Sequence, residues 1–293
     1  MLNTYFVEGG VGKCTAFTAL IPQLKKKSEV QIYTPYIGCF GGNPDVKMAF
    51  EGTIPLTHPD IMASDNLYYS EPYKSNFQFG KQHLIESYCE HHGVKYKASM
   101  KPKIYTEQYK EKVAEWLKVN KIGKYILIQL SGGQAQMGFN PNNQYTNINP
   151  NRNYPHFLAQ QVVNMLLEEY KDTTIINCVL PNEPHYQGTI RCDLHWTHIH
   201  EMLKGAEGFI SIDSCLQHFS ASAEKHGVVL WGSTRWTQFG YSHNKNLQFH
   251  MKDNWDETKY VESDPRNVMV EPKLIIDSFK KLDKDKPVAC ATK

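Results

Sequence analysis

The feature that most constrains the fold is a repeated alternation of short apolar runs with amphipathic runs. The apolar runs are rich in Val, Ile, Phe and Tyr and are bounded by Gly, Pro or Asn, a pattern typical of strands buried on both faces of a sheet. We predict strands at Leu2–Val7, Val30–Tyr33, Tyr125–Leu130, Thr174–Leu180, Phe209–Asp213 and Val228–Trp231. Helical periodicity predicts helices at Thr15–Lys27, kinked at Pro22, and at Glu107–Val119, Phe157–Glu169 and Lys273–Leu282. This alternation predicts an α/β fold with parallel sheets.

The chain length and one composition break predict two domains. A chain of 293 residues suits either one large domain or two domains of roughly 120–170 residues, and the composition break favours two. Lys101–Lys103 forms a Pro-containing basic linker, a charged amphipathic helix follows, and Gly123 precedes the very apolar strand Tyr125–Leu130. We therefore expect domains over residues 1–120 and 121–293.

Composition excludes several classes of protein. The net charge of +2 gives no overall electrostatic signature of nucleic-acid binding. No run of about 18 apolar residues occurs, and the N-terminus lacks the pattern of a signal peptide, so we expect no stable membrane insertion and a cytoplasmic location. The seven cysteines are scattered without a Cys-x-x-Cys pair, and the histidines lack firm ligand spacing. We therefore expect no bound metal and no cofactor.

A glycine-rich turn, Glu8–Thr15, follows the first predicted strand and opens a helix. Glycine permits a tight turn, and helix N-terminal amides favour an anion. One interpretation is a P-loop of an ATPase, although Val7 replaces the first glycine of that motif and Cys14 replaces its magnesium-binding hydroxyl residue. Two other interpretations stay open, namely an entry loop for a sugar-transfer site and a tight turn without a ligand.

The second half carries polar residues directly after two predicted strands. Asp213 and Ser214 end one strand, His218 follows one helical turn later, and Ser233 and Thr234 end the next strand. Ligands in open α/β sheets bind beyond the carboxyl ends of the strands, so these five residues are candidates for ligand binding. The alternative is that Asp213 or Ser214 only caps the following helix.

These motifs, in this order, resemble the family 9 glycosyltransferases, the heptosyltransferases of lipopolysaccharide synthesis. Phe209–Thr234 is similar to the family's Asp-Ser/Thr-Gly-x-x-His segment and its following strand. The similarity extends to Gly42–Val46, Arg152–Pro155 and Leu180–Glu183. The resemblance implies the GT-B architecture, in which two Rossmann-like domains face each other across a cleft. It also implies that the terminal helix can cross back to the first domain.

The resemblance implies roles for individual residues. Backbone amides of Ser131, Gly132 and Gly133 would cradle phosphate, Arg152 would contact the diphosphate, and Glu183 would bind the ribose. The strand-end group defined above, Asp213, Ser214, His218, Ser233 and Thr234, would also bind the donor. Gly9, Gly10 and Gly12 would form the acceptor-side loop. The implied reaction moves a sugar from a nucleotide-diphosphate sugar, ADP-heptose-like, to a glycan or another hydroxyl acceptor such as a modified nucleic-acid base, without a metal.

Two positions depart from the family pattern. Lys13 stands where the family has its catalytic Asp, so the catalytic candidates are Lys13 itself and the adjacent Glu8, and Asp65 is a further carboxylate to consider. Cys215 stands where the family has Gly. Two alternative functions therefore stay open, a deviant P-loop ATPase and a non-catalytic nucleotide-sugar-binding protein.

Overall fold

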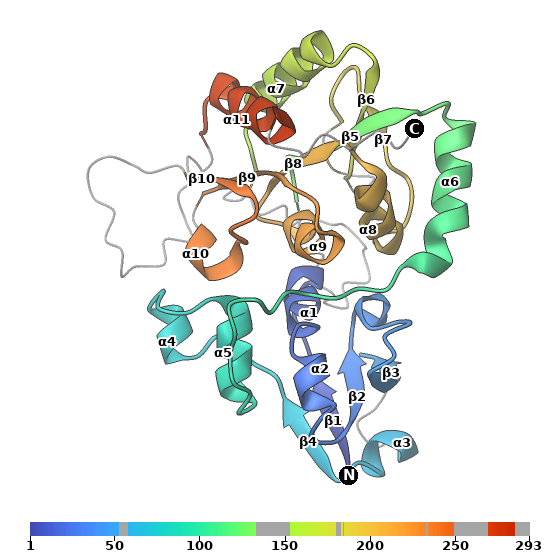
Figure 1. Ribbon diagram of the computed structural model, residues 1–293, viewed down its shortest axis with the longest axis vertical. Helices are drawn as coiled ribbons and strands as arrows, with labels where there is room; N and C mark the ends of the chain where they lie inside the picture. The colour runs from blue at the N-terminus through green and yellow to red at the C-terminus, as the bar shows by residue number, and fades with distance from the viewer. Residues whose placement is uncertain are drawn as a thin grey trace, which may run out of the picture.

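Two parallel sheets organise the chain (Figure 1). The structure is a computed structural model that describes residues 1–52, 58–132, 153–179, 183, 185–232, 234–248 and 269–284. Within these residues the first sheet has 4 strands in the order β3-β2-β1-β4, and the second has 6 in the order β10-β9-β8-β5-β6-β7. Every strand pair is parallel. The predicted α/β class with parallel sheets is thereby confirmed.

The strands and helices alternate along the chain. The strands are β1 Leu2–Phe6, β2 Glu29–Thr34, β3 Val46–Glu51, β4 Asn66–Tyr69, β5 Lys124–Gln129, β6 Thr173–Asn177, β7 Ile190–Arg191, β8 Gly208–Ile212, β9 Gly227–Trp231 and β10 Lys245–Gln248. The α-helices are α1 Val11–Phe17, α2 Ile21–Leu24, α3 Pro59–Met62, α4 Ser75–Gln78, α5 Leu84–His91, α6 Lys110–Val119, α7 His156–Glu169, α8 Trp196–Gly205, α9 Cys215–Ala223, α10 Trp236–Phe239 and α11 Pro272–Lys284. Two 3-10 turns, η1 Ile37–Cys39 and η2 Glu107–Tyr109, complete the described elements.

The predicted helix over Thr15–Lys27 is wrong in its bounds. The chain forms α1 and then α2, separated by residues 18–20. Pro22 lies at the start of α2, where its missing N–H leaves no helical hydrogen bond unmade. The proline therefore begins a second helix instead of kinking one long helix.

Strands β8 and β9 are neighbouring interior strands of the second sheet, and all their residues are buried. Their side chains alternate between the two faces of the sheet. Phe209 and Val229 join the apolar cluster on one face, whereas Ile210 and Leu230 join the cluster on the other. A strand covered on both faces must be apolar at every position, which is why these segments read as continuous apolar runs.

Helices α7 and α11 cover the outer face of the second sheet (Figure 1). Ile275 and Phe279 of α11 are buried in that layer, and Lys280 pairs with Glu169 of α7 at 2.5 Å. Over its described residues, α11 packs on α7, β9 and β10, all in the second half of the chain. The expected crossing of the terminal helix back to the first half is therefore not seen for residues 272–284.

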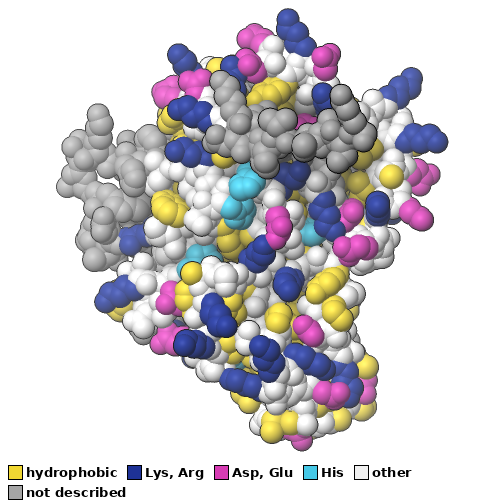
Figure 2. Space-filling view, viewed as in Figure 1, with side chains coloured by type: hydrophobic (Ala, Val, Ile, Leu, Met, Phe, Trp, Pro, Cys, Tyr) yellow, Lys and Arg dark blue, Asp and Glu magenta, His cyan; other side chains and the backbone are white. Residues whose placement is uncertain are grey.

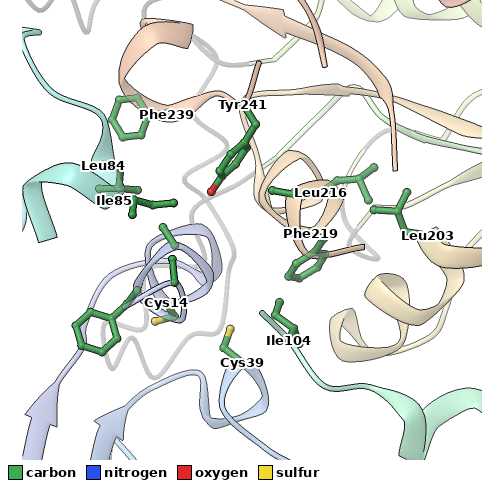
Figure 3. Packing of buried hydrophobic residues seen from close by; sticks show 14 of the residues in the cluster. Cys14, Cys39, Leu84, Ile85, Ile104, Leu203, Leu216, Phe219, Phe239 and Tyr241 are labelled. Carbon is green, nitrogen blue, oxygen red and sulfur yellow. The ribbon is translucent and has the colours of Figure 1, made fainter. Parts of the chain in front are cut away.

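Helices α8 and α9 cover the inner face of the second sheet, and α9 packs directly on α1 of the first half. Figure 3 shows the result, with Cys14 and Leu84 from the first half and Leu216 and Phe219 from the second in one apolar cluster. Burial of apolar area stabilises this junction in the same way as it stabilises a single core.

The chain between α5 and η2 runs along the junction of the two halves (Figure 1). The Lys103 N–H donates to the Thr18 hydroxyl at 2.9 Å, and the Ile104 N–H donates to the Ser222 hydroxyl at 2.8 Å. This connection is thus hydrogen-bonded to the segment between α1 and α2 on one side and to α9 on the other. Helix α6 follows it and packs on α8, and a domain boundary near residue 120 stays a prediction.

Two histidines at this junction make the fold sensitive to acid. Burial lowers the pKa of His83 to about 4, partly offset by its hydrogen bond to a carbonyl, and burial lowers the pKa of His200 to about 4. His83 Nε2 donates to the Gly240 carbonyl at 3.0 Å while its Nδ1 accepts the Ile85 N–H at 3.2 Å. His200 Nδ1 bonds the Thr106 hydroxyl at 2.9 Å. Figure 2 shows that histidine side chains also reach the surface near the middle of the visible face.

We expect the free energy of unfolding to fall as pH drops from 6.5 toward 4. Above pH 6.5 these histidines are neutral in both the folded and the unfolded state. Below pH 6.5 they bind protons in the unfolded state but stay neutral in the folded state, because their folded pKa is lower. Unfolding is therefore favoured as the pH falls. Each histidine contributes a loss of up to about 1.4 kcal/mol per pH unit in this window. Urea unfolding at pH 7.5, 6, 5 and 4 measures the loss. A urea midpoint that does not change between pH 7.5 and pH 5 would contradict the prediction.

Candidate functional site

The site begins at the carboxyl ends of β5 and β8, two neighbouring parallel strands. Ser131 and Gly132 follow β5, and Asp213 and Ser214 follow β8. A methyl group placed on Gly132 would lie 3.3 Å from the Ser214 hydroxyl oxygen. Ser131 and Asp213 are both buried. The structure therefore brings together these four residues, which sequence reasoning placed at the donor's phosphates.

Helix α9 begins at this point. Ser214 is its N-cap residue but makes no capping hydrogen bond with its side chain, so the alternative that Ser214 serves as a side-chain cap is not supported. The Gln129 side-chain oxygen instead accepts the Leu216 N–H at 3.4 Å. The start of a helix carries partial positive charge, which favours an anion. The Gly132 N–H donates to Asn153 Oδ1 at 2.9 Å, so a phosphate bound by this amide must displace Asn153.

Glu183 lies beside the same strand ends. It is buried, and its carbonyl accepts a hydrogen bond from Arg191 Nη2 at 3.1 Å. Burial is the main cause that raises the pKa of the Cys215 thiol, and the negative charge of Glu183 adds to the effect, so this carboxylate lies near the start of α9. Glu183 thus shares one region with the residues that sequence reasoning assigned to the donor.

His218, on the first turns of α9, faces the first half of the chain. Its Nδ1 bonds the Tyr241 hydroxyl at 3.0 Å, and Figure 3 shows that hydroxyl directed toward α1. A methyl group on Gly12 would lie 2.6 Å from His218 Cδ2 and 2.8 Å from Nε2. The glycine-rich turn and the strand-end site are therefore in contact across the junction.

Substitution of Gly12 by alanine should destabilise the protein by about 1–3 kcal/mol, because the added methyl group overlaps the His218 ring. Alanine normally stabilises a helix relative to glycine by about 1 kcal/mol, so the contact reverses the ordinary sign. Thermal unfolding of Gly12→Ala and of Gly10→Ala measures the difference. Gly10 is the matched control because a methyl group there meets nothing within 4 Å. Equal stability of the two variants would show that the ring moves aside freely.

The glycine-rich turn holds Lys13 in a fixed position. Gly9 has a φ of +97°, and a methyl group there would lie 2.4 Å from Lys13 Cδ, so the lysine side chain folds back over the turn. Lys13 Nζ lies 3.5 Å from Glu71 Oε2 and 3.8 Å from the centre of the Tyr73 ring. Glu8 accepts a hydrogen bond from the Tyr69 hydroxyl, and this bond is the main cause that raises the pKa of Tyr69 to about 12.

Most of the remaining residues predicted for the donor site lie outside the described part of the chain. Gly133, Arg152 and Ser233 lie outside the described residues, as do Leu180, Pro181 and Asn182. Thr234 is buried, and its carbonyl accepts from Gln248 Nε2 at 3.3 Å. The roles of all these residues stay predictions.

Sequence reasoning missed three residues of this region. Gln129 accepts a hydrogen bond from the start of α9, and a single polar residue near the end of a very apolar strand was a signal that pointed to it. Tyr241 orients His218, and Glu71 pairs with Lys13. Neither has a local sequence signal, because each contact depends on how distant segments pack.

The described residues contain no group of three or more His, Cys, Asp or Glu side chains arranged to hold a metal ion. The cysteines in this part of the chain are unpaired thiols, and Cys178 is buried as a core residue. Among the helices that the structure describes, none has both the length and the apolar character needed to cross a lipid bilayer.

No family model and no curated protein sequence matches this chain. Solved structures do. A family 9 glycosyl transferase from Veillonella parvula is similar with a TM-score of 0.71 and 10% identity, covering 97% of both chains. The ADP-heptose lipopolysaccharide heptosyltransferase II of E. coli has a TM-score of 0.69 and 11% identity, covering 97% of this chain and 99% of its own. The E. coli heptosyltransferase WaaC with ADP has a TM-score of 0.53 and 11% identity, covering 84% and 92%.

These likenesses extend over almost the whole chain and include both parallel sheets. The chain therefore has the fold of the GT-B glycosyltransferases, and the predicted architecture is confirmed.

Proposed function

We propose that this protein is a glycosyltransferase that moves a sugar from a nucleotide-diphosphate sugar to a hydroxyl acceptor. The observation that carries the proposal is the convergence of Gly132, Asp213 and Ser214 at the strand ends beside the start of α9, with His218 of the same helix against Gly12 of the other half. The GT-B fold of the chain supports the same assignment.

The arrangement suits transfer from an activated sugar. As the bond from the sugar to the diphosphate breaks, negative charge grows on the leaving phosphate. The start of α9 carries partial positive charge that stabilises such an anion, and the Gly132 amide can donate to it once Asn153 is displaced. Asp213 and His218 lie next to this position, where the sugar and its phosphate would be held. By the family resemblance, Arg152 would add bidentate donors that suit a diphosphate.

The family resemblance and the enzymes with similar structures indicate a donor, an acceptor and a reaction that needs no metal. One of the E. coli enzymes named above is an ADP-heptose heptosyltransferase, and the other has a solved structure with ADP. We therefore propose an ADP-sugar as the donor, with Glu183 on the ribose, a glycan or other hydroxyl compound as the acceptor, and transfer without a metal ion.

The P-loop alternative is disfavoured by the glycine-rich turn itself. Thr15, the hydroxyl residue nearest to the magnesium-binding position, is fully buried with its hydroxyl 3.7 Å from Cys39 Sγ. Cys14 is also fully buried, with its sulfur 3.3 Å from the Thr34 hydroxyl. Both side chains therefore point into the core and away from a bound phosphate.

Binding and turnover of nucleotide sugars test the proposal. Thermal shift and calorimetry are measured with ADP-, UDP- and GDP-sugars, each with EDTA and with magnesium. A donor present at 100 times its dissociation constant should stabilise the protein by about 2.7 kcal/mol. Selective binding followed by release of the nucleotide diphosphate in EDTA is the expected result. Hydrolysis of magnesium-ATP without sugar-nucleotide binding would establish the ATPase alternative, and binding without turnover would establish the non-catalytic one.

A further inference from the structure

We propose that Glu71 is the general base that takes the proton from the acceptor hydroxyl, with Lys13 as its positioning residue. This inference rests on the proposed function. It concerns the position directly after the glycine-rich turn. The resembled family has a catalytic Asp there, whereas this chain has Lys13.

Glu71, from another segment of the chain, places a carboxylate beside Lys13. Lys13 folds back over Gly9, and Glu71 Oε2 lies 3.5 Å from its Nζ. The side chain of Lys13 is only 14% exposed and that of Glu71 is 31% exposed, so the pair is partly withdrawn from water while the carboxylate stays accessible. A substrate hydroxyl can therefore approach Glu71 over the turn.

The backbone after Glu71 holds its carboxylate in one orientation. The Tyr73 N–H donates to Glu71 Oε1 at 2.8 Å, and the Tyr73 ring lies 3.8 Å from Lys13 Nζ. One oxygen of Glu71 is thus fixed by the backbone. The other faces Lys13 at 3.5 Å, longer than a normal hydrogen bond, and keeps lone pairs for a hydroxyl donor. A general base requires this combination of fixed orientation and unused acceptor capacity.

Glu8, the other carboxylate at the turn, is engaged by a side chain of β4. It already accepts the hydroxyl hydrogen of Tyr69, and no described cation pairs with it within ion-pair distance. Glu8 therefore holds Tyr69, the last residue of β4, and we assign it to positioning the segment that leads to Glu71.

The turn also lies at the junction with the proposed donor site. Gly12, next to Lys13 in the chain, is in contact with the His218 ring of α9. An acceptor bound over the turn would therefore approach the donor from the first half, as transfer across the junction requires.

The proposed step couples loss of the acceptor proton to transfer of the sugar. The acceptor O–H bond breaks and its proton moves to a Glu71 carboxylate oxygen, while the acceptor oxygen forms a bond to the anomeric carbon. The bond from that carbon to the phosphate oxygen breaks, and its electron pair leaves on the nucleotide diphosphate. No oxidant, reductant or further reactant is needed.

The experiment compares Glu71→Gln, Glu71→Asp and Glu8→Gln with wild type in the full-length protein. Donor dissociation constants are measured by calorimetry, and release of nucleotide diphosphate is measured with water and with a panel of sugars as acceptors. We expect Glu71→Gln to lower kcat by about 100- to 10,000-fold, the usual contribution of a general base, with donor affinity within twofold of wild type. Glu71→Asp should recover part of kcat because it keeps the carboxylate. Glu8→Gln should lose at most tenfold.

The matched control is Glu29→Gln. Glu29 pairs with Lys47 at 2.7 Å on the surface of the first half, so its loss also breaks a lysine–carboxylate pair, away from the glycine-rich turn. It should leave kcat unchanged. A Glu71→Gln kcat within threefold of wild type, or a loss in Glu8→Gln as large as in Glu71→Gln, would overturn the inference. Wild-type protein that binds no nucleotide sugar, or that binds donors without releasing nucleotide diphosphate, would instead overturn the proposed function itself.

Discussion

A Phe219→Ala variant is expected to lose about 3–5 kcal/mol of the free energy of unfolding, the usual cost of removing a fully buried aromatic ring. Phe219 has no exposed surface. Its ring stacks on Trp196 with centroids 6.2 Å apart, and it meets the edge of His200 at 5.8 Å. Removal of the ring leaves a cavity among side chains of α8 and α9 that the surrounding elements cannot fully close.

The loss should affect both halves of the chain together. Phe219 belongs to the apolar cluster that joins α9 to α1 and α5 (Figure 3). Because this cluster is shared, urea unfolding followed by tryptophan fluorescence and by far-ultraviolet circular dichroism should shift by the same amount. Two separate transitions, with only one of them shifted, would contradict a shared core. Phe157→Ala is the control because Phe157 is 61% exposed, and it should change stability by less than about 0.5 kcal/mol.

A Gly132→Val variant is expected to lower donor affinity about 10- to 100-fold, which corresponds to about 1.4–2.7 kcal/mol. Even a methyl group at this position would lie 3.3 Å from the Ser214 oxygen and 3.5 Å from Ile212 Cδ1. The larger valine must push against the end of β8 and fill space that the phosphates of a donor would occupy. Calorimetric titration with the nucleotide sugar that binds wild type measures the loss.

Gly123→Val provides the matched control. Gly123 precedes β5, whereas Gly132 follows it, and a methyl group on Gly123 meets nothing within 4 Å. The control should bind the donor as wild type does. An unchanged donor affinity in Gly132→Val would remove the strand ends of β5 and β8 from the proposed donor site.

The strands that the sequence predicted are the interior strands of the two sheets. β1, β2, β5, β6, β8 and β9 each have a strand on both sides. The missed strands β3, β4, β7 and β10 are the four sheet edges. All four residues of β4 are exposed, and β7 has only two residues. Edge strands carry weak apolar patterns because one side and often one face meet water, so their pairing depends on tertiary neighbours.

The candidate site also contains residues that the sequence predicted and residues that only the structure revealed. The position of Asp213 and Ser214 after a predicted strand made them candidates for ligand binding, and the family resemblance added Gly132. The structure brings Gly132 next to Ser214. The sequence could not place Glu71 beside Lys13, since the two are far apart in the chain and no periodic pattern links them. It also suggested that the terminal helix reaches the first half, whereas described residues of α11 pack on the second.

What the sequence by itself determined is the local content of each half, namely alternating buried strands and helices and the polar residues at the strand ends. Those features depend on periodicity and on residue type, which are properties of short segments. Only the tertiary structure decided that α1 packs on α9, that His218 meets Gly12, and that Lys13 has a carboxylate partner. These contacts arise from burial of apolar area between distant segments, which is non-directional and leaves no local pattern in the sequence.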